Sequence, residues 1–247
     1  MDMGYADARR CLSGMGADGL PFEPEVMRMQ SSNTLGITFR EKMEGPFALG
    51  ATDPKDGKAR GEKAGTKLTM RASITISDLD KFTKDPGHQG EIAGDIDFAP
   101  LGMGLPASKG VFSLFSPAED PKIRLMVYEL AFRAGGKDYY LAGRKEVHDD
   151  PGFDILSDTT TLLSTLHEGS DRSGKVAGAG VLTLGVNDLV RLLKTVNVTG
   201  ANSPADRARA ISTFGTFFTG QLWHQYKGFA TATSWWRRLI NKLTGRK

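Results

Sequence analysis

The sequence has a single cysteine, Cys11, among its 247 residues. One thiol cannot form an intramolecular disulfide or supply the ligands of a cysteine-rich zinc site. No hydrophobic run approaches the ~18 residues that a membrane-spanning helix needs. Residues 1–10 also lack the apolar stretch of a secretory signal. We therefore expect a cytoplasmic protein that is stabilised by a buried core.

Familiar catalytic and cofactor motifs are also missing. The sequence has no G-x-S-x-G, H-E-x-x-H or C-x-x-C motif, and its four histidines are scattered. Residues 169–175 have phosphate-loop spacing, but Val176 stands where a magnesium-binding hydroxyl is required. Gly178 and Gly180 lack the third glycine of a dinucleotide fingerprint. We interpret residues 169–175 as a turn, and we expect no bound cofactor.

Glycine is abundant instead, with 30 residues, which favours many turns and hairpins over long helices. Short segments of alternating hydrophobicity separated by glycine or proline predict strands. The fold class expected is mainly β (α+β): an antiparallel β-barrel or sandwich closed by two or three C-terminal helices. The predicted strands cover residues 34–45, 67–76, 91–98, 110–116, 123–133, 138–147, 159–167 and 176–184.

Four segments follow from this pattern. We expect an N-terminal arm at 1–33, an antiparallel β domain at 34–185, helices packed on that domain at 186–228, and a basic amphipathic tail at 229–247. Within the β domain, residues 52–65 are charged and glycine-rich and predict an exposed loop. Ser77 is the predicted N-cap of a short helix, and Ser203, Pro204 and Asp206 predict the start of a longer one.

One hairpin can be predicted to the register. Gly135-Gly136 suits a tight two-residue turn, which pairs Arg133 with Asp138 and Tyr128 with Gly143. Tyr128, Leu130, Phe132, Tyr139 and Leu141 then share a buried face. The opposite face carries Glu129, Tyr140 and Arg144, with His148 beyond the predicted strand. Those four residues either line a ligand cavity or belong to a solvated outer face, and the second arrangement is the more common.

An acidic cluster follows this hairpin. Asp149, Asp150 and Asp154 lie close to His148, and carboxylate oxygens are the ligands that calcium prefers. The cluster does not match an EF-hand loop, and aspartates also stabilise turns by accepting local backbone N–H groups. We favour the turn, with a metal site or general acid–base chemistry as the alternatives.

The C-terminal tail is basic and amphipathic. The net charge of +3 is too small to indicate nucleic-acid binding, but residues 235–247 carry five basic residues and no acid, so the remainder is mildly acidic. A helix here would place Trp236, Leu239, Ile240 and Leu243 on one stripe, with Trp235 at its edge. This stripe would contact either the membrane surface or protein, its own sheet or a partner.

Several blocks resemble a bacterial region found beside cholesterol-oxidase-like flavoenzymes of the glucose–methanol–choline oxidoreductase family. They are ISDLDKFTKDPGHQGEIAGDIDFAPLG, GKDYYLAGRKEVHDDPGFDILSDTTTL, GAGVLTLGVNDLVRLLKTVNVTG and FGTFFTGQLWHQY, within residues 35–226. The flavin-binding portion of those enzymes is absent, so no catalytic residue carries over. The resemblance implies an accessory module associated with the oxidation of sterols or other lipids, with a flavoenzyme as partner.

Together these observations predict a non-enzymatic module that binds a lipid or sterol and works with an oxidoreductase. It would be cytoplasmic, in contact with the inner membrane if the tail binds lipid. One alternative is a small enzyme acting on a lipid-like substrate, with Glu129 as the acid–base group. The other is a structural interaction subunit that touches no ligand.

Overall fold

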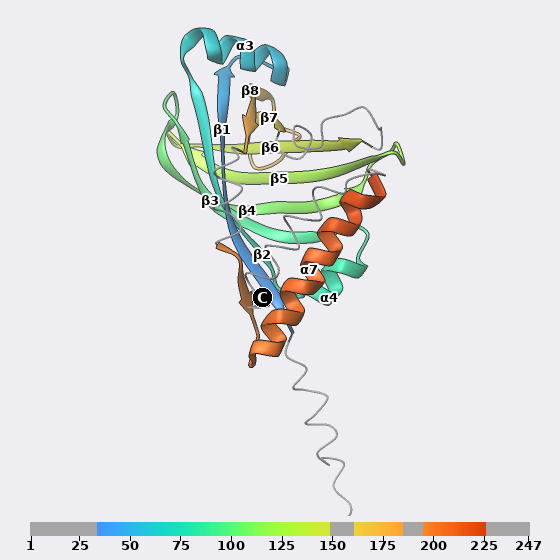
Figure 1. Ribbon diagram of the computed structural model, residues 1–247. Coiled ribbons are helices and arrows are strands. Elements are labelled where there is room, and N and C mark those ends of the chain that lie inside the picture. The colour runs from blue at the N-terminus through green and yellow to red at the C-terminus, as the bar shows by residue number, and fades with distance from the viewer. Residues whose placement is uncertain (1–33, 149–160, 185–194, 226–247) are drawn as a thin grey trace, which may run out of the picture. The chain divides into compact units, whose positions relative to one another are not determined.

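The computed structural model describes residues 34–148, 161–184 and 195–225. The predicted N-terminal arm at 1–33 and the tail at 229–247 lie outside these residues. Eight described strands form an antiparallel sheet in which each strand pairs with the next along the chain and β8 pairs with β1. The sheet is therefore a closed barrel (Figure 1), and the predicted fold class is confirmed. The strands are β1 (Gly36–Leu49), β2 (Lys67–Ile76), β3 (Gln89–Phe98), β4 (Gly102–Pro117), β5 (Ile123–Ala134), β6 (Lys137–His148), β7 (Thr161–Glu168) and β8 (Val176–Thr183).

The β5–β6 hairpin has the predicted register. Arg133 pairs with Asp138 and Tyr128 with Gly143. Gly135 and Gly136 have φ of 55° and 79°, the backbone of a primed turn that side-chain-bearing residues adopt with strain. Arg133 Nε lies 2.9 Å from Asp138 Oδ1, so the charges meet across the ladder. The turn between β7 and β8 occupies residues 169–175 and leads into a strand, which confirms that this glycine-rich segment is a turn.

The hydrophobic core lies inside the barrel. Alternate residues of each strand face inward, and every strand from β1 to β8 contributes buried hydrophobic side chains, for example Phe47, Met70, Ile96, Phe112, Leu130, Leu141, Leu162 and Leu182. The Phe47 and Phe98 rings lie edge to face, 5.3 Å between centroids. Such pairs add to the stabilisation from burial alone.

Residues 52–65 do not form the predicted exposed loop. They contain the helix α3 (Pro54–Ala64), which Asp53 caps at its N-terminus and Gly65, in the left-handed conformation, ends. The side of α3 that faces the barrel consists of glycine: a Cβ on Gly57 would come within 2.0 Å of the Ala179 carbonyl oxygen, and one on Gly61 within 2.4 Å of the Phe47 nitrogen. The prediction was wrong because this helix packs by close backbone approach and not through a hydrophobic stripe.

Two further helices lie together at the end of the barrel where β1 begins (Figure 1). The short helix α4 (Leu79–Lys84) is capped by Asp78, one residue after the predicted cap Ser77, because the Asp78 carboxylate accepts from the Lys81 N–H. The long helix α7 (Pro204–Gln225) begins at the predicted capping box. There the Asp206 N–H donates to the Ser203 hydroxyl at 3.1 Å.

Helix α7 is held by aromatic contacts. Phe214 packs against Phe39 of β1 and Phe82 of α4, with centroids 6.1 and 6.5 Å apart, and Phe217 packs against Phe82 and His88. A last short strand, β9 (Asn197–Thr199), pairs with the first residues of β1. The chain predicted to be helical before β9 lies mostly in 185–194, outside the described residues.

Candidate functional site

The most unusual feature of the barrel interior is a group of three polar side chains, Glu41, Tyr128 and Lys145. They stand at inward-facing positions of β1, β5 and β6, where the neighbouring inward residues are hydrophobic. The side chains of Glu41 and Lys145 are each only 2% exposed, and Tyr128 is 4% exposed. Lysine and glutamate are almost never buried this deeply unless they are paired.

The three side chains contact one another. Lys145 Nζ lies 3.4 Å from Glu41 Oε1, and the Tyr128 hydroxyl donates to Glu41 Oε2 at 3.1 Å. Lys145 Nζ also donates to the Tyr128 oxygen at 3.4 Å and lies 4.7 Å from the centre of the tyrosine ring. The polar triad, as we name these residues, is therefore a closed set of contacts in which each member touches the other two.

The triad leaves hydrogen-bonding capacity unused. An ammonium group has three N–H donors, and a carboxylate accepts at about four positions. Within the described residues, Lys145 contacts only two acceptors, and each oxygen of Glu41 takes one donor. One buried N–H of Lys145 and part of the Glu41 carboxylate therefore face no partner from the described chain. Buried polar groups are normally satisfied, so this is where a further polar group is expected.

Burial and charge both act on Tyr128. Its loss of solvent raises the pKa of the phenol well above its usual value, and the nearby negative charge of Glu41 raises this pKa further. Tyr128 is therefore a neutral hydrogen-bond donor at any physiological pH, which matches its donation to Glu41.

A row of aromatic rings connects the triad to helix α7. The Phe112 ring lies edge-on to Tyr128 at 5.3 Å and to Phe39 at 6.1 Å. Phe39 in turn contacts Phe214 of α7. The triad is thus separated from the α7 end of the barrel by aromatic side chains, and helix α7 supplies the last of them.

The predicted site residues lie on the other side of the barrel wall. Glu129 and Tyr140 have the opposite strand parity to Tyr128 and Leu130, so they are on the outer face. Both are still buried, and Arg172 of the β7–β8 turn forms an ion pair with Glu129. Glu129 accepts a hydrogen bond from the Tyr140 hydroxyl, and burial, together with this carboxylate, raises the tyrosine pKa. Glu129 and Tyr140 were predicted to share one face of the hairpin, and their side chains are in contact. Their role in a ligand cavity stays a prediction.

The other predicted residues are not part of that cluster. Arg144 is exposed and its Nε lies 3.1 Å from Glu146 Oε1. The backbone of His148 pairs with Ile123, and its side chain lies outside the described set. The acidic residues Asp149, Asp150 and Asp154 and the tail residues Trp235, Trp236, Leu239, Ile240 and Leu243 also lie outside the described residues.

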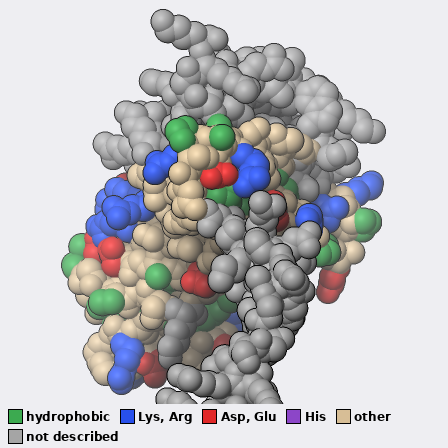
Figure 2. All heavy atoms as spheres, turned by 90° about the horizontal axis from the view of Figure 1, so that it is seen from below, with side chains coloured by type: hydrophobic (Ala, Val, Ile, Leu, Met, Phe, Trp, Pro, Cys, Tyr) green, Lys and Arg blue, Asp and Glu red, His purple; other side chains and the backbone are tan. Residues whose placement is uncertain are grey.

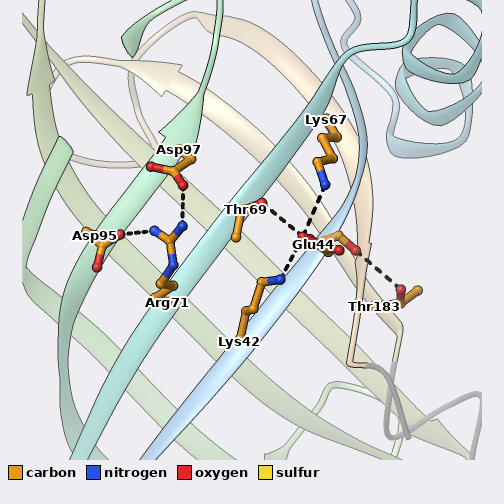
Figure 3. Close-up of polar contacts among 8 residues, drawn as sticks. All are labelled: Lys42, Glu44, Lys67, Thr69, Arg71, Asp95, Asp97 and Thr183. Carbon is orange, nitrogen blue, oxygen red and sulfur yellow. Dashed lines mark hydrogen bonds and ion pairs between the residues drawn. The ribbon is translucent and has the colours of Figure 1, made fainter. Parts of the chain in front are cut away.

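Exposed charges on the outer wall form ion pairs of a different kind. Figure 3 shows Arg71 of β2 between Asp95 and Asp97 of β3, an arrangement that lowers the pKa of Asp97 through the hydrogen bond from Arg71. Glu44 lies beside Lys42, at 3.0 Å, and Lys67, and the hydrogen bond from Lys42 lowers its pKa. These half-exposed pairs contribute little each.

The face drawn in Figure 2 has the same mixed character: basic and acidic side chains alternate among small separate groups of hydrophobic ones in its described part. No described group of three or more histidine, cysteine or acidic residues could hold a metal ion. None of the helices in the described ranges is both long enough and apolar enough to cross a membrane.

Sequence reasoning named none of the three triad members as a site residue and predicted only that Tyr128 is buried, although a signal was present. In the predicted strand at 34–45, Glu41 has the same alternation as the hydrophobic residues Ile37 and Phe39. Lys145 has the same parity as Tyr139 and Leu141, which were assigned to the buried face. Two opposite charges at buried positions of separate strands suggest a pair.

Comparisons with protein-family models, with curated proteins and with solved structures give no match to this chain.

Proposed function

We propose that this barrel binds a hydrophobic small molecule, a lipid or a sterol, whose polar end lies against Glu41, Tyr128 and Lys145. The observation that carries the proposal is the polar triad itself. It is buried in a mainly hydrophobic interior, and one lysine N–H has no partner among the described residues. The interior of an eight-stranded barrel is just wide enough to be filled by side chains or to hold one small ligand.

The energetics support a role for the triad beyond stability. Burying two charges costs several kcal/mol per ion, and replacing a buried pair by well-packed hydrophobic residues is often neutral or stabilising. A barrel that needed only a stable core would therefore be served equally well by leucine or methionine at these positions. Ionisable groups placed in a hydrophobic environment are common at functional sites.

Helix α7 is the proposed gate. It is attached to the barrel end mainly through Phe214 and Phe217, and the row of rings that begins at Phe214 leads to Tyr128. Movement of this one helix would open the end of the barrel nearest the triad, and its aromatic side chains would line the path of an apolar ligand.

The wider setting of the proposal comes from the sequence. The resemblance of residues 35–226 supports an accessory role beside a flavin-dependent oxidoreductase, to which the barrel would present its ligand. The tail at 229–247 supports contact with an anionic membrane surface, and the location proposed with it is the cytoplasm at the inner membrane.

The enzyme alternative centred on Glu129 has weaker support. Both of its oxygens are engaged, one by the Tyr140 hydroxyl and the other by Arg172, so this carboxylate is not available as a general base without losing a partner. A purely structural subunit is the remaining alternative, and it predicts that no ligand binds at all.

Ligand binding is tested with the purified full-length chain. Organic extracts analysed by mass spectrometry should contain a lipid, and fluorescent fatty-alcohol, fatty-acid or sterol probes should bind. The variant Lys145→Met should weaken the binding of the preferred probe, whereas Lys58→Met, an exposed lysine of α3, should not. Empty extracts together with no binding by any probe would refute the proposal.

The partner and the membrane are tested separately. Affinity purification from cells that express the protein with a neighbouring flavoenzyme should recover the enzyme, and recovery equal to that of an unrelated barrel would exclude it. Cosedimentation with anionic liposomes should be lost at high salt and on ending the chain at Thr231. Equal, negligible sedimentation of both chains would exclude the membrane contact.

A further inference from the structure

We infer that the polar end of the ligand is uncharged, a hydroxyl group in particular, and that Glu41 selects against fatty-acid anions. This inference rests on the proposed function and specifies its ligand class. It follows from the charge balance and the free hydrogen-bonding positions of the polar triad.

The charge balance of the triad is already complete. Lys145 carries one positive charge and Glu41 one negative charge, 3.4 Å apart, and the raised pKa of Tyr128 keeps its phenol neutral. A ligand carboxylate that reached Lys145 would introduce a second negative charge beside Glu41 in a place shielded from water, where like charges repel strongly. A neutral group introduces no such repulsion.

The free positions match a hydroxyl group. Lys145 has one N–H without an acceptor among the described residues, and the Glu41 carboxylate has free acceptor positions. A hydroxyl accepts from a lysine and donates to a carboxylate at the same time. A carbonyl group could use only the lysine, and an alkane could use neither. Sites whose buried polar groups pair with a ligand hydroxyl discriminate strongly against analogues that lack it.

The same reasoning identifies Glu41 as the residue that sets specificity. Without the negative charge of Glu41, Lys145 becomes an unbalanced buried cation, and a ligand carboxylate then supplies the missing counter-charge. Exchanging the carboxylate for an amide of nearly the same shape should therefore reverse the preference of the site.

The experiment compares three probes with the same pyrene-labelled chain: dodecanol, dodecanoic acid and dodecane. Their dissociation constants are measured by fluorescence at neutral pH for the full-length wild type, for Glu41→Gln and for the control Asp95→Asn. The control removes a carboxylate from the exposed wall, where Asp95 pairs with Arg71. Circular dichroism verifies that each variant is folded.

We expect the wild type and Asp95→Asn to bind the alcohol about tenfold or more tightly than the acid, with the alkane also weaker than the alcohol. Glu41→Gln should bind the acid more tightly than the alcohol. A wild type that binds the acid as well as the alcohol would overturn the inference while leaving the proposed function intact.

A folded Glu41→Gln protein with the wild-type preference would likewise overturn the role of Glu41. If that variant does not fold, the wild-type ranking of the three probes decides, together with Tyr128→Phe, which keeps the charge balance and should keep the preference for the alcohol. Binding of none of the three probes by the wild type would refute the proposed function and the inference with it.

Discussion

Removing the positive member of the buried ion pair should destabilise the barrel far more than removing the pair. In Lys145→Met the side chain is one atom shorter and uncharged. Glu41 then stays buried, and among the described residues its partner is the Tyr128 hydroxyl alone. Leaving one buried charge uncompensated costs about 3–5 kcal/mol. In a domain of this size that corresponds to a fall of about 10 °C in the midpoint of thermal unfolding.

The double variant Lys145→Met/Glu41→Leu removes both charges. It has no uncompensated buried carboxylate and it gains hydrophobic contacts. We therefore expect its free energy of unfolding to lie within about 1–2 kcal/mol of the wild type. The two single variants and the double variant form a cycle. The interaction free energy it yields should be about 4 kcal/mol or more, because each single variant leaves one buried charge uncompensated and the double variant leaves none.

Urea unfolding followed by circular dichroism measures all four proteins. The slope of the free energy against urea must remain the same among them for the comparison to hold. If Lys145→Met were as stable as the wild type, or if the cycle gave an interaction free energy near zero, the buried pair would not exist in solution as described and the reasoning about the site would fail.

Three further predictions concern the barrel wall. Gly61→Val should lower the free energy of unfolding by about 1–3 kcal/mol, measured in urea, because a Cβ there comes within 2.4 Å of the β1 backbone; an unchanged stability would contradict the close packing of α3. Arg71 lowers the pKa of Asp97, so this pair should stabilise the fold at neutral pH and lose its effect as the pH falls through the lowered pKa. Asp97→Asn should therefore reduce the free energy of unfolding at neutral pH but not in acid. A difference between variant and wild type that stays the same at both pH values would count against the pair. Tyr140→Phe should lower the free energy of unfolding by about 1–2 kcal/mol, measured in urea, because a hydrogen bond to a buried carboxylate is lost. The control is Tyr139→Phe, whose hydroxyl has no hydrogen bond within the described residues, and it should cost less. Equal losses in the two variants would argue against the Tyr140 hydrogen bond.

The sequence allows the β5–β6 hairpin to be predicted in full because its determinants are local. A two-residue glycine turn and strict alternation on either side leave one register that buries Tyr128 and Phe132 together. The other strands are predicted in the right place but with shifted ends. Alternation is local and indicates where a strand lies, whereas its ends depend on partners elsewhere in the chain.

Helix α3 and the triad could not be predicted in this way because both depend on distant segments. The surface against which Gly57 and Gly61 pack comes from β1 and β8, and no periodic pattern in residues 54–64 reports it. The Glu41–Lys145 contact spans 104 residues. Each charge read alone is a polar residue in a strand, and only closure of the barrel brings them together.

Strand β1 is longer than the part of its edge that β8 covers. Its second half, from Glu44 to Leu49, pairs with β8, whereas Gly36–Thr38 pairs with β9. Between them, Arg40 exchanges backbone hydrogen bonds with the hydroxyl of Thr195. The segment 195–199 thus covers backbone groups that would otherwise form a free strand edge, the kind of surface through which β proteins recruit further strands and aggregate. By covering this edge, the three residues of β9 and the Thr195 hydroxyl disfavour polymerisation of the protein through β1.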